Sequence, residues 1–342
     1  MNNVKLSICM ATFKRGKFIA ETLDSILAQM VPGIELIVVD GASPDNTPAV
    51  MAEYVSRHPE IRYIREASNS GVDQDYDKAV GYATGEYCWL MTDDDLLCPG
   101  AVSRLLCELD GGNDLIIVNQ EVRNADFAVL LDRSRFAARI DKQYAAGDRD
   151  ALFAETAQGL SFIGCVVIRR SIWMSRDRAS WYGSLFIHVG VIFQHPPVER
   201  VKFIAAPLIV IRYGNAMWTA RSFEIWMFIW PQLLWAFSDF SDRAKALASA
   251  PAPWRNFRQL LIYRAYGGYS MAEYRRFLAP HVSGSYRLTC LAVAMCPAAL
   301  VNILCSLNCL LRKRGARAEM YSLATGPHAS WVSRIAARLL GV

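Results

Sequence analysis

The sequence contains little charge for its length. Asp, Glu, Lys and Arg make up 20% of the 342 residues, whereas an average soluble domain has about 25%. Hydrophobic residues account for 53%, and the mean hydropathy is +0.16. A very large core, or contact with a membrane, would explain this composition. The length suits a catalytic domain of roughly 200–250 residues plus an appendage.

Metal-binding and targeting patterns are also missing. The nine cysteines include no C-x-x-C pair, and none of the five histidines has zinc-finger spacing, which excludes a zinc-finger type of site. We expect buried free thiols in a reducing compartment. The first residues lead into a short strand-like run and not into an apolar stretch of signal-peptide length. We therefore expect the catalytic part to stay in the cytoplasm.

Strand-like and helix-like segments alternate in the first 120 residues. Strands are expected at 6–11, 34–39, 61–64, 87–91 and 115–118, and helices at 18–30, 48–58, 75–83 and 99–109. This order predicts an α/β fold with a mostly parallel sheet. Farther on, we expect a polar helical region at 126–158 and a strand pair at 203–213 that Pro207 interrupts.

Polar residues stand where three of these strands end. Thr12 and Asp40 close the first two, and Asp93, Asp94 and Asp95 follow the fourth. Ligands of such sheets bind beyond the carboxyl ends of the strands. Adjacent carboxylates suit Mg²⁺ or Mn²⁺, which could bridge them to a diphosphate and stabilise it as a leaving group. The structural alternative is a solvated acidic turn with Asp95 capping a helix.

Four segments, in order, resemble family-2 glycosyltransferases of the GT-A fold. They are the opening strand and loop at 6–15, the stretch at 36–45, the stretch at 69–87, and the DxD-like motif at 92–95. The resemblance covers about a third of the chain, from residue 5 to about 120. It implies a GT-A sheet flanked by helices, with a divalent metal and a nucleotide-diphosphate sugar as ligands.

The resemblance also implies roles for individual residues. The donor nucleotide would be bound by Thr12, Phe13, Arg15, Asp40, Ser43 and Asp93; the donor sugar by Asp77 and Lys78; and Mn²⁺ or Mg²⁺ by Asp93, Asp94 and Asp95. Three positions depart from the family pattern. Gly41 stands where a second Asp is common, Thr92 replaces the first Asp of the commoner motif, and Asp77 replaces an Asn.

The family usually places an acidic general base about ninety to a hundred residues after the DxD motif. The corresponding stretch here, 182–189, contains no acid. His188 is the nearest candidate and could act at neutral pH, although a buried core histidine is an equal alternative. Asp177 is a second candidate, or only part of a surface ion pair. Arg212 and Trp218 could close over the diphosphate or the acceptor, or belong to a plain loop.

The C-terminal region, 221–342, is expected to be a helical extension of a transferase domain at 1–220. From Ser285 onward there are seven Lys and Arg residues and one acid, although the whole chain carries only +5. The segment 288–311 has 24 residues without charge, which could span a bilayer, lie in its plane or form a buried helix pair. Trp331, Ile335 and Leu339 share a helix face beside Arg334 and Arg338, as in helices that lie on anionic lipid; ordinary helix packing is the alternative.

These features together predict a glycosyltransferase, hexosyl or deoxyhexosyl, of bacterial envelope polysaccharide or lipopolysaccharide synthesis. The donor would be UDP-, CDP- or dTDP-linked, and an inverting reaction would move its sugar to a hydroxyl of a glycan or lipid-linked acceptor. We expect the protein at the cytoplasmic face of the inner membrane, peripheral or monotopic, with no nucleic-acid partner. The alternatives are a nucleotidyltransferase and a non-catalytic nucleotide-sugar-binding protein.

Overall fold

The computed structural model describes residues 4–312 and 316–342 and divides the chain into two compact units. The first unit runs through Glu121 and includes Ser134–Ile211 and Phe237–Ala248; the second comprises Val122–Arg133, Arg212–Ala236 and the chain from Ser249 onward. The division at residues 220 and 221 remains a sequence-based prediction. Lys313 and Arg314, which contribute to the basic C-terminal region, lie outside the described residues.

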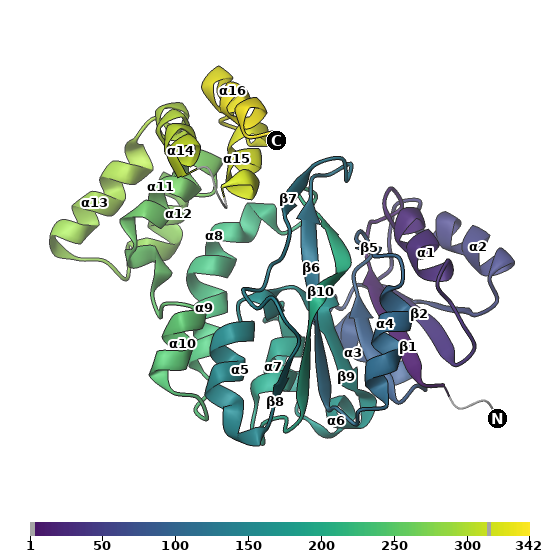
Figure 1. Ribbon diagram of the computed structural model, residues 1–342. Helices are drawn as coiled ribbons and strands as arrows, with labels where there is room; N and C mark the ends of the chain where they lie inside the picture. Colours follow the sequence, from purple (N-terminus) through teal and green to yellow (C-terminus); the bar gives the residue numbers. More distant parts are fainter. Residues whose placement is uncertain (1–3, 313–315) are drawn as a thin grey trace. The chain divides into compact units, whose positions relative to one another are not determined.

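Four parallel strands form one half of the central sheet (Figure 1). They are β1 (Leu6–Thr12), β2 (Ile34–Asp40), β3 (Ile61–Arg65) and β4 (Tyr87–Met91), in the order β3-β2-β1-β4. Every residue of β1 and β4 is buried, because helices cover both faces of a parallel sheet. The connecting helices are α1 (Ile19–Leu27), α2 (Thr47–Arg57) and α3 (Val72–Tyr82), and α3 packs on β1 and β2. The predicted mostly parallel α/β fold is confirmed.

Antiparallel strands complete the sheet in the order β4-β9-β6-β10-β5. The strands are β5 (Leu96–Leu97), β6 (Leu115–Arg123), β9 (Val166–Arg169) and β10 (Val201–Arg212), with β7 (Leu130–Asp132) on β6 and β8 (Lys142–Tyr144) on β10. Helix α4 (Ala101–Leu109) follows β5. The remaining helices of the first unit are α5 (Arg149–Thr156), α6 (Arg170–Ser175), α7 (Ile187–Phe193) and α10 (Asp242–Ala248). Rings from α5, from α7 and from the stretch before α10 meet in an aromatic cluster of Phe153, Phe193, Phe237 and Phe240.

Two expectations for the middle of the chain were wrong. The stretch 126–158 contains β7, β8, a short 3-10 turn at Ala146–Asp148 and one α-helix, α5. It is not helical throughout, because β7 pairs with β6 and β8 pairs with β10. The stretch 203–213 is a single strand and not an interrupted pair. Pro207 lies between the part of β10 that pairs with β8 and the part that pairs with β5, so its missing N–H disrupts neither ladder.

All nine cysteines are free, as expected, but they are not all buried. Cys9, Cys88, Cys165, Cys290 and Cys309 are buried, Cys98, Cys296 and Cys305 are partly buried, and Cys107 is exposed. Cys107 lies on α4, whose opposite face carries Ala101, Val102, Leu105 and Leu109 into the core.

The second unit is helical. It contains α8 (Ser222–Glu224), α9 (Trp230–Trp235), α11 (Phe257–Tyr266), α12 (Met271–Glu273), α13 (Gly284–Met295), α14 (Ala298–Arg312), α15 (Arg317–Thr325) and α16 (Trp331–Leu339), with π-helical turns at Ile225–Ile229 and Tyr274–Leu278. One core gathers around Phe223, Leu260 and Tyr269. The other joins α14, α15 and α16 through Val301, Met320 and Ala336.

The charge-free run at 288–311 is not one helix. It falls on α13 and α14, which are bent by 97° at the break between them. Pro297 occupies this break, where it lacks an N–H and disfavours helical backbone at the preceding residue. Among the described residues, no single helix is long and apolar enough to cross a membrane, whereas this bent pair passes that test jointly.

Asn302 is a fully buried polar residue on α14. Its Nδ2 donates to the Leu323 carbonyl at 2.9 Å, and its Oδ1 accepts from the Ser330 hydroxyl at 3.1 Å. These bonds connect α14 to the end of α15 and to the start of α16. Buried polar groups in such a position need their partners, since an unpaired one carries its full desolvation penalty.

We predict that Asn302→Ala lowers the free energy of unfolding by about 1–3 kcal/mol, because it leaves the Leu323 carbonyl unpaired. Urea denaturation followed by tryptophan fluorescence measures the change. Asn308→Ala on the exposed side of the same helix is the matched control, and we expect it to stay within about 0.5 kcal/mol of the parent. Equal losses in both variants would contradict the role given to Asn302.

Candidate active site

The site begins with the register of the parallel strands. Thr12 on β1 is paired with Asp40 on β2, and Met10 on β1 is paired with Met91 on β4. The carboxyl ends of the three strands are therefore level, and Asp93 follows two residues beyond Met91. The expectation that Thr12, Asp40 and the aspartates meet at one edge agrees with this register.

Arg15 connects the loop after β1 to the aspartates. Its Nε lies 3.3 Å from an Asp93 carboxylate oxygen, and its Nη2 lies 3.1 Å from Asp94. The Arg15 amide donates to the Thr47 hydroxyl at 3.0 Å, which anchors the loop to α2. Burial, together with the neighbouring Asp94 charge, raises the pKa of Asp93 to about 7. The single positive charge of Arg15 therefore does not balance the negative charge of the two carboxylates.

Asp95 has a different environment from its two neighbours. Its carboxylate accepts a hydrogen bond from the Thr92 hydroxyl at 2.5 Å, so the residue that departs from the family pattern holds the third aspartate. Among the described residues, no three His, Cys, Asp or Glu side chains form a group that could hold a metal. The three-aspartate set is thus not assembled as one cluster.

The carboxylates nevertheless fit a divalent cation in another way. Mg²⁺ and Mn²⁺ commonly take only one or two protein carboxylates and obtain their remaining oxygen ligands from substrate phosphates and water. Asp93 and Asp94 provide two buried carboxylates held together by Arg15. A hard cation arriving with a diphosphate would supply the positive charge that this buried pair needs.

Asp40 is completely buried and held by two donors. Its Oδ1 accepts from the Ser43 amide at 2.8 Å, and its Oδ2 accepts from the Tyr63 hydroxyl at 2.6 Å. The Ser43 hydroxyl in turn accepts from the Lys14 amide at 3.0 Å, so Ser43 joins the loops after β1 and β2. Phe13, beside Lys14, is partly exposed, with the Lys14 ammonium 5.1 Å from its ring centre.

Asp75 explains why Gly41 departs from the family pattern. A Cβ at position 41 would lie 2.6 Å from the Asp75 Oδ2 atom, which is closer than any ordinary contact. Asp75 is buried and accepts from the Ser70 hydroxyl at 2.6 Å. A carboxylate from α3 therefore takes the space that a larger residue at position 41 would need.

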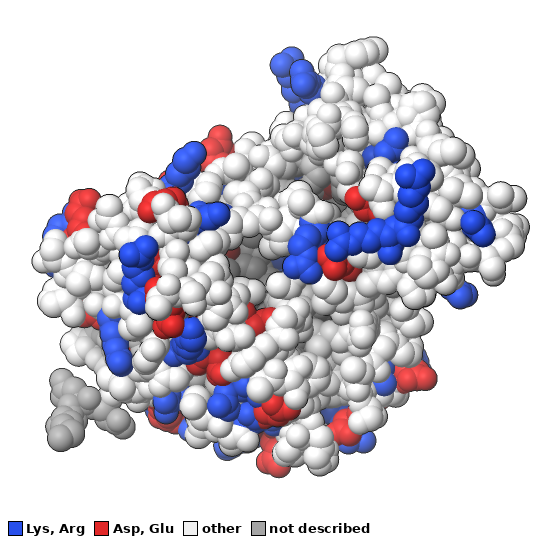
Figure 2. All heavy atoms as spheres, turned by 180° about the vertical axis from the view of Figure 1, so that it is seen from behind, with Lys and Arg blue, Asp and Glu red and all other residues white. Residues whose placement is uncertain are grey.

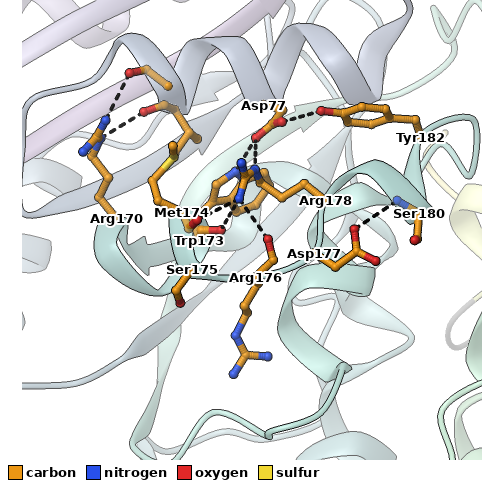
Figure 3. A network of polar contacts seen from close by, with 12 residues as sticks. Asp77, Arg170, Trp173, Met174, Ser175, Arg176, Asp177, Arg178, Ser180 and Tyr182 are labelled. Carbon is orange, nitrogen blue, oxygen red and sulfur yellow. Dashed lines mark hydrogen bonds and ion pairs between the residues drawn. The ribbon is translucent and has the colours of Figure 1, made fainter.

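Asp77 and Lys78, the predicted donor-sugar residues, have partners within the first unit. Figure 3 shows Asp77 accepting from the Trp173 indole at 2.8 Å and the Tyr182 hydroxyl at 2.5 Å, and pairing with Arg178 at 2.8 Å. Lys78 pairs with Glu66 at 2.7 Å. Asp77 thus fixes α3 to the segment after β9, which contains Asp177.

Asp73 is a site residue that the sequence analysis missed. It is buried at the start of α3, where its carboxylate accepts from the Leu185 amide at 2.9 Å and the Ile187 amide at 3.1 Å. It thus holds the acid-free stretch in which a base was expected. The acids at 73, 75 and 77 alternate along the sequence, but acids in a first helical turn also suit the helix dipole, so this signal is not specific.

The structure places the two base candidates in opposite environments. His188 is enclosed on α7, and one ring nitrogen, Nε2, lies 2.6 Å from the Leu160 carbonyl. Burial lowers the pKa of His188 to about 4, which favours the alternative of a neutral core histidine. Asp177 is exposed, and hydrogen bonding to the side chain of Ser180, followed by the bond from the Ser180 amide at 3.2 Å, lowers its pKa.

Arg212 and Trp218 belong to the second unit. Arg212 donates to the Ala125 carbonyl at 2.6 Å, and its guanidinium lies 4.1 Å from the Phe127 ring centre. Trp218 is half exposed, with its ring 5.9 Å from that of Trp226. Their roles toward a diphosphate or an acceptor remain predictions.

We predict that Gly41→Ala lowers the melting temperature and weakens nucleotide binding, because its Cβ would displace Asp75. Overpacking of this kind costs about 1–3 kcal/mol. Gly81→Ala on α3 is the matched control, since nothing lies within 4 Å of the added Cβ. Thermal melts and nucleotide titrations measure both effects, and a Gly41→Ala protein as stable as the control would refute the clash.

The buried His188 predicts a pH-dependent stability. Its pKa falls from 6.5 in the unfolded chain to about 4 in the fold, so the unfolded state binds more protons between these values and stability falls on acidification. This group alone should remove about 2 kcal/mol between pH 7 and pH 5. Urea melts at both pH values should show a smaller difference for His188→Gln than for the exposed control His281→Gln; equal pH dependence in the two variants would exclude this linkage.

Comparisons with known proteins show that this chain is similar to glycosyltransferases. Residues 7–173 match the model of glycosyl transferase family 2. Abequosyltransferase RfbV of Salmonella typhimurium is 25% identical over 223 residues, covering 61% of this chain and 67% of the relative. Chondroitin synthase of Escherichia coli is 30% identical over 121 residues, covering 35% of this chain but only 18% of its own length.

Solved structures show the same fold over nearly the whole chain. Residues 1–349 of Staphylococcus aureus TarS, in complex with UDP, align with a TM-score of 0.58 at 15% identity, covering 93% of this chain and 89% of that one. The UDP-GlcNAc complex of the same protein gives a TM-score of 0.54. The GT-A-type fold and the resemblance found in the sequence are both confirmed, and residues 7–173 carry a glycosyl transferase family 2 domain.

Proposed function

We propose that this protein transfers a sugar from a nucleotide-diphosphate donor to a hydroxyl of a glycan or lipid-linked acceptor in envelope polysaccharide synthesis. The observation that carries the proposal is the level edge of β1, β2 and β4. There Thr12 and Asp40 are neighbours in register, and Arg15 holds Asp93 and Asp94. All of these residues lie inside the segment that matches the family.

The named relatives support this choice. The Salmonella relative is an abequosyltransferase, and the TarS structures contain UDP and UDP-GlcNAc. Both are consistent with a nucleotide-linked sugar as the donor, with UDP, CDP and dTDP as the candidate carriers. The match to glycosyl transferase family 2 counts against the nucleotidyltransferase alternative.

The residues divide into a nucleotide side and a diphosphate side. Asp40, fixed by Ser43 and Tyr63, would accept from the base, and Thr12 with Phe13 would pack against the base and ribose. Asp93 and Asp94 would hold Mn²⁺ or Mg²⁺, which when bound neutralises charge on the departing diphosphate. Arg15 lies on the same carboxylates, so it is placed to contact phosphate oxygens once a cation has taken over their charge.

The acceptor side is assigned to the segment that Asp73 and Asp77 hold in place. An inverting reaction needs a base that reaches the acceptor hydroxyl. Asp177 is the candidate with a solvent-accessible carboxylate, whereas His188 is enclosed. Arg178, next to Asp177, is fixed by Asp77 at 2.8 Å, which restrains the backbone beside this carboxylate.

We predict that Asp94→Asn abolishes Mn²⁺-dependent binding of the donor. A panel of UDP-, CDP- and dTDP-sugars should raise the melting temperature of the parent protein only with Mn²⁺, since a ligand that binds only the folded state stabilises it by about 2.7 kcal/mol at 100 times its Kd. Donor hydrolysis measured on the same panel should require Mn²⁺ as well.

Asp110→Asn is the control, because Asp110 is a carboxylate with an 86% exposed side chain in a surface ion pair with Lys5. It should behave like the parent protein, since exposed ion pairs contribute little. Unchanged Mn²⁺-dependent stabilisation in Asp94→Asn would reject the metal assignment. Absence of any stabilisation or hydrolysis in the parent across the panel would reject the donor class.

A further inference from the structure

Helix α14 exposes a row of leucines to solvent, although its core face buries two polar residues beside Val301 and Cys309. Leu300, Leu304, Leu307 and Leu311 lie along one face and are 46–85% exposed. Their spacing of four, three and four residues places them on one continuous stripe. The opposite face buries Asn302 and Ser306. A helix whose outer face contacts only water would carry polar residues along that face, so the leucine stripe calls for an apolar neighbour.

Two further helices of the same unit extend this apolar surface. On α16, Trp331, Ile335 and Leu339 are exposed at successive turns, while Ser333, Ala336 and Ala337 face the core. α16 packs directly on α14. On α13, Leu288 and Met295 are exposed. In the face shown in Figure 2, the upper right part is white with several blue Lys or Arg side chains and little red.

Cations border this surface. Arg334 and Arg338 are exposed on α16, one position before Ile335 and Leu339, and Arg287 is exposed beside Leu288 on α13. Glu319, the single acid from residue 285 onward, is already paired with Arg312 at 2.6 Å. The surface therefore combines exposed leucines with uncompensated positive charge, and long Arg side chains can extend along an apolar layer while their heads reach charged groups above it.

We propose that α13, α14 and α16 form a docking surface for an anionic lipid membrane, on which the helices lie in the plane of the interface. Trp331 suits the membrane–water interface, where tryptophan is favoured. A second copy of the chain fits less well as the occupant, because a symmetric contact would bring the arginines of both copies together.

The test is flotation of the full chain with vesicles of phosphatidylcholine, alone or with 30% phosphatidylglycerol. We expect the parent protein to float with the anionic vesicles and to bind neutral ones at least tenfold more weakly. The double variant Leu304→Glu/Leu311→Glu should lose at least tenfold of its binding. Both side chains are exposed, so the fold should tolerate the change. Leu247→Glu on α10, also an exposed leucine, is the matched control and should bind like the parent.

A second variant tests the charge. Arg334→Gln/Arg338→Gln should weaken binding to anionic vesicles and leave the weak binding to neutral vesicles unchanged. The proposal is overturned if the parent does not float with anionic vesicles, or if the leucine variant floats as well as the Leu247→Glu control. It is also overturned if the protein is a dimer without lipid and Leu304→Glu/Leu311→Glu makes it a monomer, since the occupant would then be a second copy. None of these readouts depends on sugar transfer.

Discussion

The register between β1 and β2 is the constraint on which the candidate site depends. Pairing Thr12 with Asp40 brings two strand ends to one level, and pairing β1 with β4 on the other side brings the aspartate loop to the same level. A shift of register by one residue would exchange the two faces of β1, and the close packing of its side chains against the elements on each side opposes such a shift. The packing of β1 therefore fixes the position of Asp40 and of the aspartate loop, which lie on other segments of the chain.

Sequence patterns predicted the parallel half of the fold well, because β1, β2 and β4 are largely apolar runs at whose ends polar residues stand. They failed where neighbouring strands decide the structure. Short edge strands such as β7 and β8 have no pattern of their own, and Pro207 looked like a break because its position between two pairing partners is invisible in the sequence. A helix pair was one of the alternatives for 288–311, but the 97° bend between the two helices could not be predicted from the sequence.

The residues of the candidate site were likewise predicted only in part. Asp40 and Asp93–Asp95 stood out because they end strands. Asp73 and Asp75 lie at the start of a helix, where acids are common for reasons of the helix dipole, so their contacts with the 182–187 segment and the Gly41 loop needed three-dimensional information. His188 illustrates the reverse case: its side-chain type suggested chemistry, whereas its burial against the Leu160 carbonyl suggests a core residue.

The contact between Gly41 and Asp75 has a consequence for how this chain and its relatives can vary. Because the two side chains would occupy the same volume, only one of positions 41 and 75 can carry a carboxylate. A relative with an acid at the first position should then carry a smaller residue at the second. Such an exchange would keep the negative charge at this edge of the sheet constant and would move the carboxylate from α3 to the end of β2. The two positions are therefore expected to change together.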